Sequence, residues 1–478
     1  MSLKARLLGG TTLITLAEGL ILPTGFVTLT FLTRQLGTDG YGLFALTATI
    51  VTWVEWGLNS VFSRTTIKFV SEAKEKSDIA TAVVRAQLGC GMLAAAGVMF
   101  AAPAIANLLH EPKLVQLLRL FALEIPLVNI AQAHQNILAG MGKFSARAAA
   151  TAVRWIARLL LIVVFVQTGL SIAGAILGSL AAMLADLLVC RCYVRPSLWQ
   201  HSNFPLSALT GYAIPLFMSA LALRLYAKLD LLAFKALGGS ADQAGIYAVG
   251  QNLALFGGVM SPALAPVLIA TVSELLSQGE INKIKLLSQA AMRVVLLHLP
   301  FVGLLAGTAR ELVLLLFGEA YLAAAPLFSL LLLATIGTVM LTVTSAVLVA
   351  SDRPRWTALL TVPLPVVALL GHWLLVPEFG AMGAATTTVG VAWLGAIAGI
   401  VAVNIRWQVL PPILTLVRCC GTGVIGMITA AYWSTSGLWL GVKLCAITIG
   451  MIFLLWIFGE ISAKDKQLFR AVLNKKTV

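Results

Sequence analysis

The sequence predicts an all-α protein that crosses a membrane many times. Of its 478 residues, 59% are hydrophobic and only 11% are charged, whereas a soluble domain carries about 25% charged residues. Runs of about 20 apolar residues recur along the whole chain, and each is long enough to cross a bilayer as a helix. The alternating pattern of outer-membrane strands is absent, so we expect the spans to be helices.

The apolar runs number about fourteen, and short polar breaks separate them. No segment between them is long and polar enough for a separate soluble domain, which excludes a sizeable catalytic domain outside the membrane. The run at 311–318 either extends the ninth span or lies at the interface. The expected spans are 11–33, 41–62, 84–109, 114–138, 149–168, 172–194, 211–236, 244–273, 289–307, 324–350, 357–376, 382–404, 418–435 and 438–458.

The distribution of Lys and Arg predicts how the spans are oriented. Cytoplasmic segments of membrane proteins carry an excess of these residues, and the pattern fits if both termini are cytoplasmic. The net charge of +14 therefore reflects topology, and we expect no nucleic-acid partner. The cations that fall on the opposite side are Arg34, Lys113, Arg119, Arg310 and Lys443.

The seventh expected span carries several charges at bilayer depth. On a helix, Arg224, Lys228 and Lys235 fall within roughly 40° of each other, whereas Asp230 points about 120° or more away. Because intramembrane charges are costly, they usually face a bundle interior or a wet cavity. We predict that the three cations line a cavity for an anionic group such as diphosphate. For Lys235 the alternative is that it reaches the outer surface.

Other charges inside the spans are weaker candidates. Arg154 is a further expected cavity cation, unless it extends to the nearby cytoplasmic surface. Glu18, Glu55 and Glu124, like Asp230, are expected either to couple ion movement or to pair with a neighbour. The five histidines and six cysteines show no metal-ligand spacing, and no enzyme motif is found, so we expect no cofactor, no metal and no catalytic site.

A short internal repeat divides the chain. FLTRQLGTDGYGLFALT near the first hairpin and AFKALGGSADQAGIYAVG near the eighth span share a basic residue, Leu-Gly, a polar turn and then Gly beside Tyr. Six spans separate the copies, which predicts parallel repeats about an axis along the membrane normal; chance similarity is the alternative. The expected parts are an N-terminal lobe at 1–208, a second lobe at 209–405, two further helices at 406–458, and a basic cytoplasmic tail at 459–478.

Three stretches carry a family resemblance: FLTRQLGTDGYGLFAL (31–46), WGLNSVFSRTTIKFVSE (56–72) and KLDLLAFKALGGSADQAGIYAVGQNLA (228–254). They resemble the polysaccharide transporter family, the bacterial O-antigen and exopolysaccharide repeat-unit flippases. That family belongs to the superfamily of the MATE exporters and the lipid II flippase. The resemblance implies two six-helix lobes in a V, with a central cavity that opens to either side in turn.

The resemblance also implies a substrate. It would be an undecaprenyl-diphosphate-linked oligosaccharide, moved from the cytoplasmic to the periplasmic leaflet of the bacterial inner membrane during lipopolysaccharide or exopolysaccharide synthesis. Its sugars would cross in the wet cavity while the lipid tail stays in the bilayer. Asp230 matches the family's recurrent acidic residue in the seventh helix. Expected partners are this substrate, membrane lipids and polysaccharide assembly proteins, and we expect a monomer.

Three alternatives remain open at this point. A MATE-like exporter of small cations would need an acidic cavity, whereas the seventh span is basic. A membrane-embedded glycosyl polymerase or ligase would need a large outer loop with catalytic groups, and no such loop is expected here. A scaffold for an assembly complex, without transport, is compatible with the same sequence.

Overall fold

A computed structural model describes residues 13–14, 16–72, 76–196, 228–258, 261–351, 354–435, 437 and 439–460. These residues form helices and connecting segments, without a strand. Contacts divide the chain into two compact units, Met1–Gly245 and Ile246–Val478. The expected lobe boundary at 208–209 and the basic tail from residue 461 onward lie outside the described residues.

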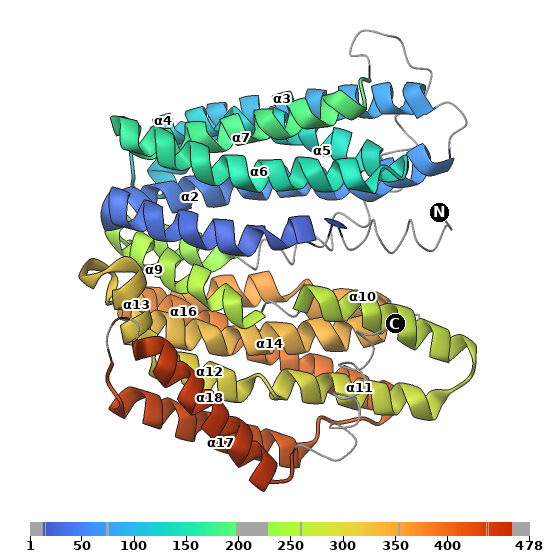
Figure 1. Cartoon of the computed structure of the whole chain (residues 1–478), viewed down its shortest axis with the longest axis vertical. Coiled ribbons are helices and arrows are strands. Elements are labelled where there is room, and N and C mark those ends of the chain that lie inside the picture. The colour runs from blue at the N-terminus through green and yellow to red at the C-terminus, as the bar shows by residue number, and fades with distance from the viewer. Residues whose placement is uncertain are drawn as a thin grey trace. The chain divides into compact units, whose positions relative to one another are not determined.

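Unit 1 is built around α5, which packs against α2, α3 and α7, while α6 pairs with α7 along its length (Figure 1). Buried aliphatic residues such as Val83, Ile137 and Leu138 fill the space between these helices. The elements are α2 (Ile21–Glu72), α3 (Lys76–Leu108), α4 (Leu114–Ala122), α5 (Glu124–Gly140), α6 (Phe144–Phe165), the π-helical turn η1 (Val166–Leu170), α7 (Ser171–Tyr193) and the start of α9 (Ala241–Ala254).

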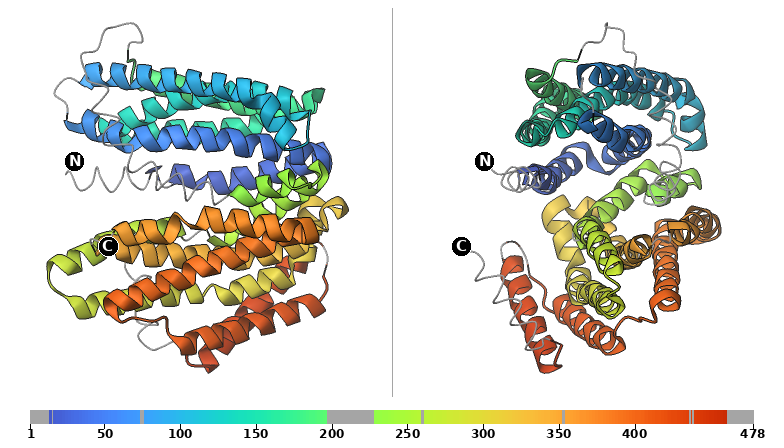
Figure 2. Two further views of the ribbon diagram at one scale, coloured as in Figure 1. Left: turned by 180° about the vertical axis from the view of Figure 1, so that it is seen from behind. Right: turned by 90° about the vertical axis from the view of Figure 1, so that its right-hand side faces the viewer.

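Unit 2 is built around α14, which packs against α10, α11, α12 and α16. Figure 2 shows α17 and α18 in red at one side of this unit, where α17 packs against α12 and α18 against α17. The remaining elements are η2 (Leu255–Gly258), α10 (Ser261–Ser277), α11 (Ile281–Leu296), α12 (Leu299–Gly307), α13 (Ala309–Phe317), η3 (Glu319–Tyr321), α14 (Ala324–Ala350), α15 (Pro354–Thr361), α16 (Leu364–Trp407), α17 (Ile413–Tyr432) and α18 (Trp439–Ile457).

Three apolar helical segments are too long for one crossing. They contain 56, 50 and 49 residues, whereas about 20 suffice. Each is interrupted at a glycine with positive φ: Gly37 at 68°, Gly169 at 89° and Gly380 at 56°. Glycine adopts this left-handed region without a steric penalty. The last two segments fold back on themselves, since Gly178 contacts Ile162 and Gly371 contacts Thr387.

The expected all-helical membrane fold is confirmed. Nine helical segments in the described part of the chain are long and apolar enough to cross a membrane. The apolar run at 311–318 lies in and directly after a separate short helix, α13. Thr308 has a non-helical backbone conformation and ends α12 before α13 begins. The count of fourteen spans stays a prediction, because the seventh expected span, 211–236, lies mostly outside the described residues.

Candidate functional site

Three arginines form a stripe along α6. Arg147, Arg154 and Arg158 are seven and four residues apart, which places them on one helical face. Arg154 is 7% exposed, and the other two are half-buried. Because α6 begins at Phe144 and a helix rises 1.5 Å per residue, Arg154 and Arg158 lie roughly 15 and 21 Å along it. Both therefore sit near mid-span and point into unit 1 rather than reaching the surface.

Arg154 is held by Asp186 of α7. Its Nη1 lies 3.8 Å from Asp186 Oδ2, and the carboxylate is fully buried. Gln135 of α5 donates from Nε2 to both carboxylate oxygens, at 3.0 and 2.9 Å. The Arg154 guanidinium also lies over the Trp155 ring, 4.7 Å from its centroid. Three helices thus meet at one buried carboxylate.

Glu18 belongs to the same neighbourhood. Its side chain is half-buried, and its charge acts on both Arg147 and Asp186. The structure therefore brings together Arg154, which the sequence predicts as a cavity cation, and Glu18, which it predicts as a residue for ion coupling or pairing. We call this group, with Arg147, Arg158, Asp186, Gln135, Glu55 and Glu124, the polar seam of unit 1.

At the other end of the seam two carboxyl groups share one arginine. The charges of Glu124 and Arg158 both act on Glu55 of α2, and Glu124, the first residue of α5, is 4% exposed. Arg158 also donates from Nε to Ser179 Oγ of α7, at 3.3 Å. Two acids beside one guanidinium leave one negative charge in excess when both are ionised, which suits the binding of a proton or another small cation.

Unit 1 contains many buried polar atoms without a hydrogen-bond partner in the described part of the chain, and four of the residues that carry them belong to the seam. Leaving one such group unsatisfied costs about 1–3 kcal/mol, and native proteins satisfy nearly all of them with protein, water or ligand. A region with this many is therefore suited to hold water or a polar ligand rather than to dry packing. They include atoms of Glu55, Gln87, Glu124, Asn129, His134, Asn136, Arg147, Thr151 and Arg154.

The seventh-span charges are only partly described. Arg224 lies outside the described residues, while Lys228 is half-buried at the start of the helical stretch 228–236. The Asp230 charge acts on Lys228, and Asp230 Oδ1 accepts a hydrogen bond from the Leu231 amide at 2.9 Å. Lys235 is 3% exposed and pairs with Glu111 Oε2 at 3.3 Å. The cavity role of Arg224, Lys228 and Lys235 stays a prediction.

Sequence reasoning missed two partners in these contacts. Gln135 carries no charge, so a search for intramembrane charges passes over it. The stretch Gln132–Asn136, which is polar within an otherwise apolar span, is the sequence feature that could have identified Gln135 as a candidate. Glu111 lies in a loop, where a carboxylate is normally solvated. The sequence around it therefore gave no indication that it pairs with Lys235.

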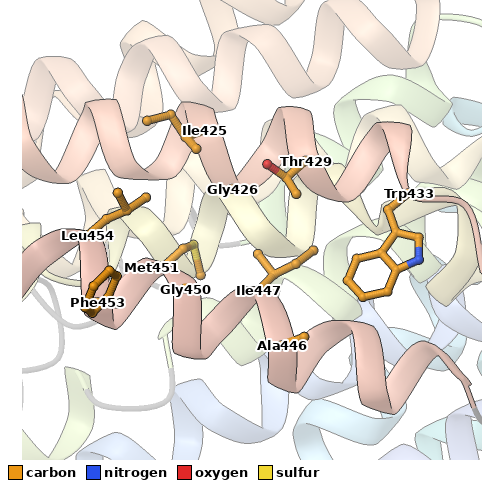
Figure 3. Close-up of a pocket in the computed structure, with 10 residues that line it drawn as sticks. All are labelled: Ile425, Gly426, Thr429, Trp433, Ala446, Ile447, Gly450, Met451, Phe453 and Leu454. Carbon is orange, nitrogen blue, oxygen red and sulfur yellow. The ribbon is translucent and has the colours of Figure 1, made fainter.

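A second feature is an apolar pocket between α17 and α18 (Figure 3). Its volume is about 360 Å³, and its lining contains no charged residue. Gly450 leaves open space on α18, whereas Met451 covers Gly426 of α17, and Trp433 lies toward one end of the pocket. Such a pocket suits a hydrocarbon chain and not a polar headgroup. No site was expected on these two helices.

The comparisons with known proteins agree with this architecture. Residues 7–276 match the model of a family described as polysaccharide biosynthesis protein, which is more than half of the chain. This chain belongs to that family. A search of curated proteins finds no match.

Several solved structures share the fold of this chain. The lipid II flippase MurJ in an inward closed conformation has a TM-score of 0.71 at 12% identity, covering 96% of this chain and 100% of MurJ. An outward-facing multidrug resistance MATE transporter of the MOP superfamily has a TM-score of 0.56 at 16% identity, covering 84% and 95%. A MOP superfamily transporter from Pyrococcus furiosus, described as having a binding pocket of reverse polarity, has a TM-score of 0.58 at 15% identity, covering 84% and 95%. The expected MOP-type fold is thereby confirmed.

Proposed function

We propose that this chain is a flippase for an undecaprenyl-diphosphate-linked oligosaccharide, an O-antigen or exopolysaccharide repeat unit. It would move this lipid from the cytoplasmic to the periplasmic leaflet of a bacterial inner membrane, with both chain termini in the cytoplasm. Two observations carry the proposal together. The chain belongs to a polysaccharide biosynthesis family, and its fold matches that of a lipid flippase over nearly its whole length.

The headgroup would need a wet, cationic path. Arg224 and Lys228 are the cations proposed to meet the diphosphate, because arginine offers a fork of donors and lysine a point charge. Lys235 is already held by Glu111, and Arg154 by Asp186. Each of these two is neutralised by its carboxylate partner, so it would contribute little to holding the diphosphate.

The lipid tail would travel separately from the sugars. A polyisoprenoid chain is fully apolar, so it gains nothing from the polar seam and remains stable in the bilayer. The uncharged pocket between α17 and α18 is of the right chemistry to hold one section of such a chain.

Ion coupling is proposed for the two acids beside Arg158. Binding of a proton or sodium ion would remove the excess negative charge that Glu55 and Glu124 create together. A change of net charge inside a low-dielectric region shifts the relative free energies of two conformations. Asp230, whose charge acts on Lys228, is proposed to pair with it or to take part in the same coupling.

A MATE-like exporter of small cations is the second candidate. The observation that favours it is the acidic excess of the seam, in which Glu18, Glu55, Glu124 and Asp186 face three arginines. The basic seventh span favours the flippase. We propose a monomer that works beside polysaccharide assembly proteins, which would deliver the substrate and remove the product.

Deletion of the gene in the native cell tests the proposal. The flippase account expects a lipid-linked oligosaccharide to accumulate with its sugars protected from enzymes added outside spheroplasts, and surface polysaccharide to be lost. Reintroducing the wild-type gene should restore both. Unchanged polysaccharide together with increased sensitivity to cationic drugs would instead support the exporter.

A further inference from the structure

A pocket lies in unit 2 where α11 begins and α16 ends. Its volume is about 440 Å³, and its walls come from α11, the last turn of α16 and the segment that leads to α17. Four polar side chains line it: Lys285, Gln289, Asn404 and Gln408. None of them belongs to the polar seam or to the seventh span.

The backbone fixes one wall of this pocket. Gln408 adopts a positive φ of 54° that ends α16, and its amide donates to Asn404 O at 2.7 Å. Gln289 donates from Nε2 to Leu410 O at 3.4 Å, which ties the connecting segment to α11. The polar groups are therefore held around one space by contacts within unit 2.

Lys285 supplies the positive charge of the pocket. In the described part of the chain, the neighbouring Lys283 pairs with Glu280 at 2.9 Å, and Arg293 and Arg418 both pair with Glu460. Lys285 takes part in none of these ion pairs. The pocket thus contains a cation, amide groups and no carboxylate, which is a set suited to one phosphate group.

The rim of the pocket is strongly apolar. Leu286 is 67% exposed, Leu410 49% and Ile413 69%. The pocket lies where the apolar segments Ile281–Gly307 and Ile413–Tyr432 begin and where Leu359–Trp407 ends. Three spans end at one level there, so that level is a membrane–water interface. Next to the pocket, Arg406 lies over Trp407 at 4.3 Å, and Trp and Arg are typical of such an interface.

We propose that this pocket binds the phosphate of an anionic phospholipid. Lys285 provides the charge, the amides of Gln289, Asn404 and Gln408 donate hydrogen bonds, and the acyl chains lie along Leu286 and Ile413. Basic pockets between membrane helices bind anionic headgroups by this chemistry. The bound lipid would bridge α11 to the start of α17. This inference rests on the membrane-spanning fold and does not depend on the transported substrate.

The test uses the full chain in detergent with its native lipids removed. Phosphatidylglycerol and phosphatidylcholine are titrated separately, and bound lipid is counted by native mass spectrometry. We expect a site selective for phosphatidylglycerol, which Lys285→Gln weakens about fivefold, the effect of one interfacial cation. Lys283→Gln is the matched control, because Lys283 is 60% exposed and paired with Glu280, and it should bind like the wild type. Melting temperatures without lipid confirm that both variants fold.

Three results would overturn the assignment. Lys285→Gln could bind phosphatidylglycerol like the wild type, or phosphatidylcholine could fill the site equally well. A soluble short-chain prenyl diphosphate could displace phosphatidylglycerol from the wild type, which would mean that the pocket binds the transported lipid instead. Because the readout is lipid binding, each of these results leaves the test of flipping independent.

Discussion

Gly42 of α2 and Gly245 of α9 lie where these two helices cross, and each glycine contacts the backbone of the other helix. A Cβ atom on Gly42 would lie 1.9 Å from the Ala241 carbonyl oxygen, and one on Gly245 would lie 2.1 Å from the Thr38 carbonyl oxygen. The contact is reciprocal. Thr38, whose carbonyl faces Gly245, lies four residues before Gly42, and Ala241, whose carbonyl faces Gly42, lies four residues before Gly245. Both glycines belong to the repeated motif, so its two copies pack backbone to backbone, as small residues allow in membrane helices.

Gly42→Ala and Gly245→Ala should therefore destabilise the protein. Backbone oxygens cannot move aside as a side chain can, and overpacking of this kind costs about 1–3 kcal/mol. The measurement is the melting temperature of the purified protein in detergent. Gly97→Ala is the control, since nothing lies within 4 Å of a Cβ there, and it should melt like the wild type. Wild-type melting of Gly42→Ala would show that the crossing is not tightly packed.

Arg154 and Asp186 should show strong energetic coupling. Arg154→Gln leaves a fully buried carboxylate without its cation, and breaking a buried pair costs about 3–5 kcal/mol. Adding Asp186→Asn should recover part of this loss, because no charge is then left unpaired. Unfolding of the two single variants and the double variant gives the coupling energy. Additive losses would show that Gln135 alone satisfies Asp186.

Lys443 should be among the most sensitive cations of unit 2. It is fully buried in α18 and pairs with Glu311 of α13, whose other oxygen accepts the Thr435 amide at 2.8 Å. Lys443→Met is expected to lower stability by about 3–5 kcal/mol, and Glu311→Gln in the same chain to recover part of it. The control pair is Lys283 and Glu280, which are 60% and 43% exposed. Lys283→Met should cost at most about 1 kcal/mol, and equal losses at both lysines would contradict the account.

Glu460 should make stability depend on acid pH. Burial alone would raise the pKa of this carboxyl, but hydrogen bonds from Arg293, Thr415 and Arg418 hold the pKa below its ordinary value of 4.5. A lowered pKa means that the stabilisation is complete above about pH 4.5 and is lost as the pH falls through the lowered value. The melting difference between the wild type and Glu460→Gln should be constant from pH 8 to 5 and shrink below 4.5.

The exposed Glu319 provides the control for this pH series, because Glu319→Gln should melt like the wild type throughout. A difference between wild type and Glu460→Gln that already shrinks between pH 8 and 6 would mean that the pKa is raised. In that case burial would outweigh the three hydrogen bonds, and the connection of α18 to α11 and α17 would be weaker than the structure indicates.

The fold was largely predictable, because one property decides it. Hydrophobic length alone fixes where α14 and α18 run, since the bilayer sets how many apolar residues a span needs. Gly37 could be recognised as a turn between spans because polar residues follow it. Hydropathy did not mark the break at Leu123 between α4 and α5, although Pro126 in the first turn of α5 is a residue type that interrupts helices.

The candidate site was predictable only in its parts. Arg154 and Asp186 are 32 positions apart, and their pairing depends on the register of α6 against α7, which no local pattern reports. Arg154 lies only five residues inside the expected span 149–168, so the sequence left open that its side chain reaches the surface. Its true surroundings follow from α6 beginning at Phe144, a boundary that hydropathy places only within several residues.

Transport by the purified protein is the decisive measurement for the proposed flippase activity. The protein is placed in liposomes with an undecaprenyl-diphosphate-linked oligosaccharide that carries a fluorescent sugar, and an impermeant quencher reports which leaflet holds it. The account predicts that the wild type equilibrates the lipid across the bilayer faster than protein-free liposomes, and that Arg224→Ala with Lys228→Ala slows this at equal protein content. Equal rates with and without the wild-type protein would contradict the claim that this chain is a lipid-linked oligosaccharide flippase.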